Sequence, residues 1–190
     1  MGRLIYLMNV SLDGFVNTPD GSVEWTVVDE ELHSWFNDET ARTDAFLYGR
    51  RLHEVMAYWQ TSDEDPNATP AMLEFGRIWR QRPKIVFSST LEAPEPPDPG
   101  ANTRIVRTDP IAELARLQEE FSGDLSVAGP TLAAEFVRRD LVDIYRVVVH
   151  PVILGAGTPF WPALDRPRTL RLFERREFGS GAVELGYERA

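Results

Sequence analysis

The stretch that decides the fold is residues 124–154, DLSVAGPTLAAEFVRRDLVDIYRVVVHPVIL. It begins with a short apolar run at residues 125–128, which breaks at Gly129-Pro130. An amphipathic segment follows, with its apolar residues at helical spacing. Residues 142–149 then have the β-branched, apolar composition of a buried strand. A strand, a tight turn, a helix and a second strand form a βαβ unit, which predicts two parallel strands in one sheet.

The turn at Gly129 is the first candidate binding site. A glycine at the carboxyl end of a strand, directly before a helix, lets a ligand approach the unpaired backbone N–H groups of the first helical turn. A phosphate or a cofactor ring is a usual ligand at such a turn. A packing turn that binds nothing is the alternative, and this stretch alone does not separate the two.

Composition and length limit the class of protein. The chain has 190 residues, of which 43% are hydrophobic, so we expect one domain, residues 1–190, with a full core. No apolar run reaches membrane-spanning length and the N-terminus has no secretory pattern, which favours a cytoplasmic protein without a membrane partner. The absence of cysteine excludes disulfides and thiolate metal sites. A net charge of −10 without a basic tail argues against nucleic acid as a partner.

The other elements follow from apolar runs and capping residues. Strands are predicted at residues 3–10, 45–48, 84–87 and 104–106, and alternation over residues 169–178 and 181–189 predicts a C-terminal antiparallel hairpin. Helices are predicted to begin after Asp29, Gly49, Thr69 and Asp109. The helix after Gly49 is expected to bury Leu52, Val55, Met56 and Trp59. The fold class is therefore α/β, a mainly parallel mixed sheet of about eight strands with helices on both faces.

Three predicted strands end alike, in small or cationic residues at a turn: Gly49-Arg50-Arg51, Ser88-Ser89-Thr90 and Gly129-Pro130-Thr131. Ligands of open α/β sheets bind outside the carboxyl ends of the strands, so three neighbouring ends could hold an extended anion such as a phosphorylated dinucleotide. Cations at a helix N-terminus oppose the helix dipole unless an anion is bound there. Two solvated side chains are the alternative interpretation of Arg50 and Arg51.

The usual dinucleotide fingerprint is absent. Gly155-Ala156-Gly157 lacks a third glycine, and Pro159 would interrupt the helix that should follow. A cofactor site therefore belongs to a different fold. Because its cations are arginines, we expect the 2′-phosphorylated cofactor NADPH rather than NADH.

The order of several blocks is similar to that of the dihydrofolate reductase-like superfamily. Within it, the chain most resembles the reductase domain of bacterial riboflavin-biosynthesis deaminase-reductases, and the resemblance covers nearly the whole chain. The blocks are SLDG (11–14), DAFLYGRRLHEVM (44–56), KIVFSSTL (84–91), AGPTLAAEFVRRDLVD (128–143) and HPVILGAGTPFW (150–161). The resemblance implies a single-domain, three-layer fold with an eight-stranded sheet whose last strand is antiparallel, NADPH as cofactor, and a homodimer.

The resemblance also implies roles for the three strand ends. By this resemblance, Gly49, Arg50 and Arg51 would contact the pyrophosphate and the 2′-phosphate of the cofactor. Ser88 and Ser89 would contact the adenosine phosphate. The turn under the nicotinamide and pyrophosphate would be formed by Gly129, Pro130, Thr131 and Leu132. Pro130 stands where the family has a second glycine. The proline removes one N–H donor but tolerates the cis peptide bond that we expect between Gly129 and Pro130.

The substrate side departs from the family pattern. True dihydrofolate reductases carry a carboxylate in the first helix, and Leu32 occupies the aligned position here, with Glu31 one residue away. Glu31 is either shifted into that role or is a plain first-turn acid favoured by the helix dipole. Asp13 is the second catalytic candidate, either a substrate contact or the residue that shapes the turn after the first strand. Asn9 and Trp25 are expected to line the substrate side.

These observations predict an NADPH-dependent oxidoreductase that transfers a hydride to a small heterocyclic substrate, a pteridine or a ribosylamino-pyrimidine-like compound. The alternative is a non-catalytic nucleotide-binding protein that kept the reductase fold. We expect no metal site, although the acidic residues 61–67 could form a weak divalent-cation site instead of a plain surface loop. The lack of cysteine for a deaminase zinc site argues against a complete riboflavin-pathway role.

Overall fold

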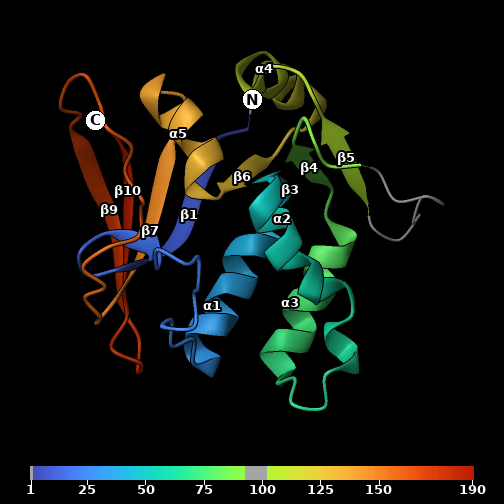
Figure 1. Ribbon diagram of the computed structural model, residues 1–190, viewed down its shortest axis with the longest axis vertical. Coiled ribbons are helices and arrows are strands. Elements are labelled where there is room, and N and C mark those ends of the chain that lie inside the picture. Colours follow the sequence, from blue (N-terminus) through green and yellow to red (C-terminus); the bar gives the residue numbers. More distant parts are fainter. Residues whose placement is uncertain (1, 93–101) are drawn as a thin grey trace.

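A computed structural model describes residues 2–92 and 102–190 (Figure 1). The strands are β1 (Leu4–Ser11), β2 (Phe15–Asn17), β3 (Thr43–Gly49), β4 (Lys84–Phe87), β5 (Thr103–Val106), β6 (Asp124–Ala128), β7 (Ile144–His150), β8 (Thr158–Pro159), β9 (Leu170–Glu177) and β10 (Val183–Arg189). The helices are α1 (Glu30–Ala41), α2 (Arg50–Met56), α3 (Pro70–Gln81), α4 (Pro110–Glu120) and α5 (Pro130–Arg138), with short 3-10 turns at Ala57–Gln60 and Ser62–Glu64.

Eight strands form one sheet in the order β5-β4-β3-β6-β1-β7-β10-β9. The first six are parallel, whereas β10 pairs antiparallel with both β7 and β9. The predicted α/β fold with a mainly parallel sheet and a C-terminal antiparallel hairpin is therefore confirmed. The sequence did not indicate the second, two-stranded sheet, in which β2 pairs with β8.

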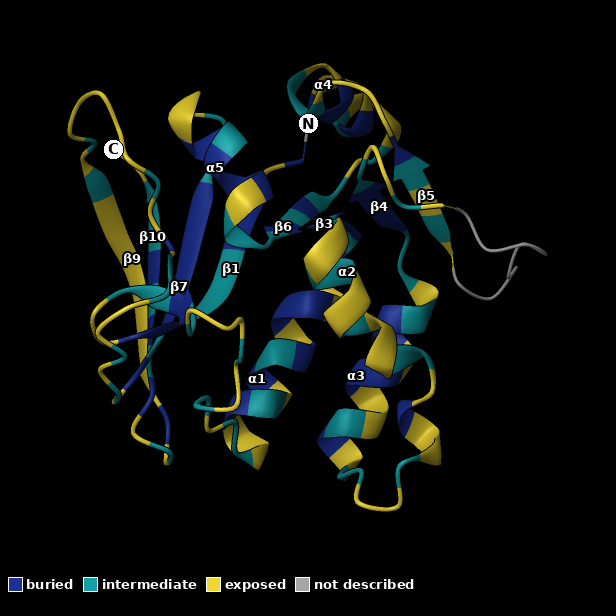
Figure 2. Cartoon of the chain, viewed as in Figure 1, coloured by how far each residue is buried: buried dark blue, intermediate teal, exposed yellow. Residues whose placement is uncertain are grey.

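Helices cover both faces of the sheet, which gives three layers (Figure 1). On one face, α4 and α5 pack on alternate strand residues such as Leu47 of β3 and Val127 of β6. On the other, Phe46 and Tyr48 of β3 contact Phe75 and Trp79 of α3. Burial on both faces explains why β7 reads as a continuous β-branched run, and Figure 2 shows it as almost wholly buried.

Three of the helices begin at a side chain that accepts a hydrogen bond from the first turn. Asp29 Oδ1 accepts from Leu32 N of α1 (2.8 Å), Thr69 Oγ1 from Met72 N of α3 (3.3 Å), and Asp109 Oδ2 from Ala112 N of α4 (3.1 Å). Such caps satisfy backbone donors that have no partner inside the helix. The remaining two helices, α2 and α5, have no side-chain cap.

Candidate functional site

The turns after β3, β4 and β6 lie side by side at the carboxyl edge of the sheet. Tyr48 of β3 is in register with Ala128 of β6, and Gly49 is in register with Phe87 of β4. The turns that start at Gly49, Ser88 and Gly129 therefore follow neighbouring positions. A Cβ at Gly49 would lie 3.9 Å from Leu132 Cβ of α5, so the turn after β3 packs against the helix that follows β6.

Gly129 gives the start of α5 an open backbone. Its φ of +90° is a conformation that residues with a Cβ rarely adopt, and a Cβ here would also lie 3.5 Å from Leu52. The Gly129 N–H donates to the thioether sulfur of Met8 at 3.3 Å, which is a weak acceptor. Pro130 occupies the first turn, where its missing N–H costs nothing. The exposed Thr131 and the buried Leu132 complete the turn, whose backbone N–H groups favour an anion.

Arg50 and Arg51 are exposed at the start of α2. Arg50 has only a long ion pair, 3.8 Å from its Nε to Glu54 Oε1. Arg51 makes no ion pair within the described residues, and the first turn of α2 holds no acid. Two cations at a helix start with so little counter-charge are unfavourable unless an anion binds there, and the phosphate site at Arg50 and Arg51 stays a prediction.

The turn after β4 brings a third cation that the sequence analysis missed. Arg107, directly after β5, donates to the carbonyl oxygens of Ser88 (3.2 Å) and Leu91 (2.7 Å). Ser88 Oγ accepts from Leu91 N at 2.9 Å, and Ser89 is exposed beside it. Arg50 was singled out because a basic residue follows an apolar strand. Arg107 follows β5 in the same way, so the same pattern would have identified it.

Asp13 connects two loops at this edge. Its carboxylate accepts from Ser11 Oγ (2.7 Å), Leu154 N (3.1 Å) and Gly155 N (2.7 Å). The hydrogen bond from Ser11 lowers the pKa of Asp13, and those from the two backbone N–H groups add to this effect. Asp13 is therefore ionised at neutral pH and holds the loop after β1 against residues 154–155.

Glu31 is also engaged within the protein. One carboxylate oxygen accepts from Arg176 Nη2 (3.1 Å) and the other from Gly179 N (3.3 Å), which joins the start of α1 to the β9–β10 hairpin. Leu32, at the position where the family carries its carboxylate, is fully buried against Trp35 and Val148. Both carboxylate oxygens of Glu31 are therefore in use within the protein, and its catalytic role stays a prediction.

Asn9 and Trp25 meet at a residue that the sequence analysis did not single out, His150. Asn9 Oδ1 lies 2.9 Å from His150 Nε2, and the Trp25 ring contacts the imidazole edge-on, with 5.6 Å between ring centroids. Only 1% of His150 is exposed, and burial lowers its pKa. In the sequence, His150 could have been noticed as the lone polar residue that follows the apolar run at residues 147–149.

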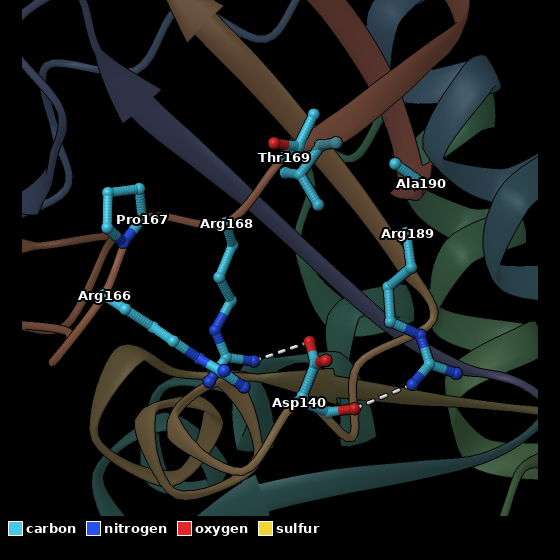
Figure 3. Close-up of a pocket in the computed structure, with 8 residues that line it drawn as sticks. Asp140, Arg166, Pro167, Arg168, Thr169, Arg189 and Ala190 are labelled. Atoms are coloured by element: carbon cyan, nitrogen blue, oxygen red, sulfur yellow. Dashed lines mark hydrogen bonds and ion pairs between the residues drawn. The ribbon is translucent and has the colours of Figure 1, made fainter.

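A cavity of about 240 Å³ lies at the opposite, amino-terminal edge of the parallel strands (Figure 3). Asp140 is one of the residues that line it. Its carboxylate pairs with Arg168 Nη1 (2.5 Å), and its carbonyl oxygen accepts from Arg189 Nη1 (2.8 Å). Arg189 also pairs with Asp143. The cations lining this cavity, apart from Arg166, are therefore neutralised inside the protein, unlike those at the carboxyl edge.

Residues 2–92 and 102–190 contain neither a metal-ligand cluster nor a membrane-spanning helix. No group of three His, Cys, Asp or Glu side chains there could hold a metal ion. In the acidic loop, Asp65 accepts from Tyr58 Oη at 2.6 Å, and Asp63 lies 3.3 Å from Arg80 Nη1. None of the helices in this part of the chain is both long and apolar enough to cross a membrane.

The chain is similar to several known proteins. An uncharacterized protein, YyaP, of Bacillus subtilis strain 168 is 29% identical over 187 residues, covering 97% of this chain and 94% of YyaP. The structure of a Thermotoga maritima diaminohydroxyphosphoribosylaminopyrimidine deaminase/5-amino-6-(5-phosphoribosylamino)uracil reductase matches with a TM-score of 0.68 and 17% identity, over 100% of this chain and 57% of that one. A dihydrofolate reductase from Enterococcus faecalis, complexed with NADP(H), matches with a TM-score of 0.65 and 14% identity, over 98% and 96% of the two chains.

At these identities the two solved structures establish the fold alone. The family model described as the RibD C-terminal domain matches residues 3–183, nearly the whole chain. It does so across the strands and turns that form the carboxyl edge. The protein therefore belongs to the RibD C-terminal domain family.

Proposed function

We propose that this protein is an NADPH-dependent reductase that transfers a hydride to a small heterocyclic substrate, a pteridine or a ribosylamino-pyrimidine-like compound. One observation carries the proposal: the uncapped start of α5 lies beside two exposed arginines that have almost no counter-charge. Membership of a family named for a riboflavin-biosynthesis protein supports it, as does the NADP(H) complex of a protein with the same fold.

The residues at the carboxyl edge fit a phosphorylated dinucleotide. The open turn at Gly129 admits a ligand to the backbone, since no Cβ stands there. Arg50 and Arg51 offer charge-assisted donors to phosphate oxygens, and the hydroxyls of Ser88 and Ser89 lie on the neighbouring turn. We include Arg107 in this proposal as a further cation near the adenosine end.

NADPH, when bound, supplies the hydride. The chain orients the two reactants and excludes water around them. In this proposal Asn9 and Trp25 line the substrate side, while Asp13 and Glu31 act as hydrogen-bond acceptors. The lowered pKa of Asp13 makes it a poor proton donor at neutral pH.

A specific observation favours the alternative, a nucleotide-binding protein without catalytic activity. Both candidate carboxylates, Asp13 and Glu31, already accept hydrogen bonds from other parts of the chain. Leu32 removes the carboxylate from the family position. A protein built in this way could hold a cofactor without activating a substrate.

Titration with NADPH, followed by tryptophan fluorescence, tests the cofactor part first. We expect saturable binding, with NADH binding more weakly because it lacks the 2′-phosphate. Absence of binding at physiological NADPH concentrations would refute the proposal. Binding without turnover across a panel of pterins, pyrimidines and quinones would instead select the non-catalytic alternative. The homodimer implied by the resemblance stays a prediction, which sedimentation equilibrium measures.

A further inference from the structure

His150 is the last residue of β7, and its buried side chain makes one hydrogen bond within the described residues. Its Nε2 lies 2.9 Å from Asn9 Oδ1, and the two residues come from neighbouring parallel strands. The oxygen of a carboxamide only accepts hydrogen bonds. His150 Nε2 must therefore carry the hydrogen and donate it to Asn9.

The other ring nitrogen fixes the charge of His150. Nδ1 is buried and has no hydrogen-bond partner within the described residues. A second proton there would create a charged, unpaired N–H group in apolar surroundings, which is strongly unfavourable. Burial lowers the pKa of His150 for the same reason. The imidazole is thus neutral and protonated at Nε2.

This tautomer determines the orientation of the Asn9 side chain. With Oδ1 held by His150, the Nδ2 amino group is left on the other side of the carboxamide, and it makes no hydrogen bond within the described residues. Asn9 is in register with Val148, which packs against Leu32 and Trp35, so Asn9 faces the α1 side of the sheet. The half-buried Asn9 lies two residues before the carboxyl end of β1.

Trp25 packs against the imidazole of this pair. Its ring meets the imidazole at an interplanar angle of 89°, and its Nε1 is likewise buried without a partner in the part of the chain that the structure describes. Buried polar groups are normally hydrogen-bonded, and exceptions call for an explanation. If Asn9, Trp25 and His150 served only to pack the protein, apolar side chains at these positions would make it more stable.

We propose that Asn9 Nδ2 donates a hydrogen bond to a carbonyl oxygen of the heterocyclic substrate, and that His150 is the positioning residue that holds Asn9 in this orientation. The inference rests on the proposed function and narrows it. Heterocycles with an acceptor in this position should bind more tightly than analogues without one. When such an analogue binds, the Asn9 N–H group gives up its hydrogen bond to water and gains none from the ligand.

The first test is nuclear magnetic resonance of the imidazole nitrogens, which needs no substrate. The chain has three histidines, at 33, 53 and 150, so a His150→Gln variant assigns the signals. We expect His150 in the intact protein to show the pattern of a neutral ring protonated at Nε2. The pattern of an Nδ1-protonated ring, or of an imidazolium at neutral pH, would overturn the inference.

The second test compares two probes in the presence of saturating NADPH. 5,6-Diaminouracil carries two carbonyl oxygens, and 4,5-diaminopyrimidine is the same ring without them. We expect the wild-type protein to bind the uracil about tenfold more tightly, the effect of one hydrogen bond. Asn9→Leu and His150→Leu should remove this preference, while His150→Gln, which keeps an amide N–H near the position of Nε2, should retain most of it.

A merely structural His150 would give a different result. His150→Leu would then change both affinities equally, and His150→Gln would rescue neither. Either that pattern or the absence of any preference in the wild-type protein overturns the inference. Direct titration of NADPH alone reports the cofactor site separately: its failure refutes the proposed function, whereas normal NADPH binding with no probe preference refutes only the role of Asn9 and His150.

Discussion

Arg146 and the pair Arg50 and Arg51 show the same side chain in opposite surroundings. Arg146 of β7 is buried, and its guanidinium contacts three carboxylates: Glu39 of α1 (2.8 Å), Glu174 of β9 (2.9 Å) and Glu184 of β10 (2.7 Å). Arg50 and Arg51 are exposed, and within the described residues their only ion pair is the 3.8 Å contact between Arg50 and Glu54. Figure 2 shows the contrast between the buried β7 and the largely exposed α2.

The difference separates a structural cation from one that is a candidate for ligand binding. The charge of Arg146 is fully used in joining one helix to three strands, so it has nothing to offer a ligand. The charge of Arg50 and Arg51 is not used, and it sits where the helix dipole makes it unfavourable. The surroundings of each arginine, rather than its residue type, therefore indicate its role, and each can be tested by substitution.

The largest expected effect is that of Arg146→Met on stability. Removing the cation leaves the fully buried Glu184 without a counter-charge and leaves Glu39 with Arg42 alone, which should lower the free energy of unfolding by about 3–5 kcal/mol. Urea denaturation measures this. Arg175→Met is the matched control, since Arg175 is exposed on β9 and should change stability by less than about 0.5 kcal/mol. A loss below about 1 kcal/mol for Arg146→Met would mean that the cluster is not structural.

Arg50→Ala and Arg51→Ala should leave stability nearly unchanged and weaken NADPH binding. Loss of a charged hydrogen bond to phosphate costs about 1.5–3 kcal/mol, or roughly 10- to 150-fold in Kd. NADH binding should fall far less for whichever arginine meets the 2′-phosphate. Arg166→Ala, at the cavity on the opposite edge, is the control and should bind NADPH normally. If both cofactors lose affinity equally in both variants, neither arginine meets the 2′-phosphate.

The sequence predicted local features well and long-range partners poorly. The run that became β7 and the capping residues Asp29, Thr69 and Asp109 were readable because each depends on its immediate neighbours. The start of helix α2 was predicted correctly, but the helix ends at Met56, so Trp59 lies in the 3-10 turn that follows. Leu52, Met56 and Trp59 pack against the core as partly buried residues, whereas Val55 is 59% exposed instead of buried.

The partners of the candidate site residues lie far away in the sequence. Asn9 meets His150 across 141 residues, and Glu31 meets Arg176 across 145. No spacing rule covers such pairs, since they depend on the order of strands in the sheet. The family resemblance predicted a site at the carboxyl edge of the sheet, but only the structure shows which carboxylates and amides at that edge are already in use.

A smaller effect is expected from Gly129→Ala. The φ of +90° at Gly129 disfavours a Cβ, so the substitution should lower the free energy of unfolding by about 1–2 kcal/mol. Gly49→Ala is a close control, because Gly49 also precedes a helix but has a φ of −79° and room for a methyl group. We expect chemical denaturation to show a change below about 0.5 kcal/mol for that control. Equal losses for the two variants would show that backbone conformation is not the cause.

The smallest effect concerns the pH dependence of stability. Burial raises the pKa of Glu184 above its ordinary value of 4.5, although the hydrogen bond from Arg146 acts in the opposite direction. The folded state therefore binds a proton more readily than the unfolded state, and this contribution to stability, present below about pH 4.5, is lost as pH rises through the folded-state pKa. Burial lowers the pKa of His33, His53 and His150, so their contribution is lost as pH falls below 6.5 and has the opposite slope.

The two effects can be separated with Glu184→Gln, which leaves the histidines unchanged. We expect the stability of this variant relative to wild type to improve as pH rises above 4.5, because only the wild-type protein loses the carboxyl contribution. Glu177→Gln, exposed on the same hairpin, should give a flat difference. A flat difference for Glu184→Gln as well would mean that Glu184 ionises as it does in the unfolded chain, with Arg146 compensating fully for its burial.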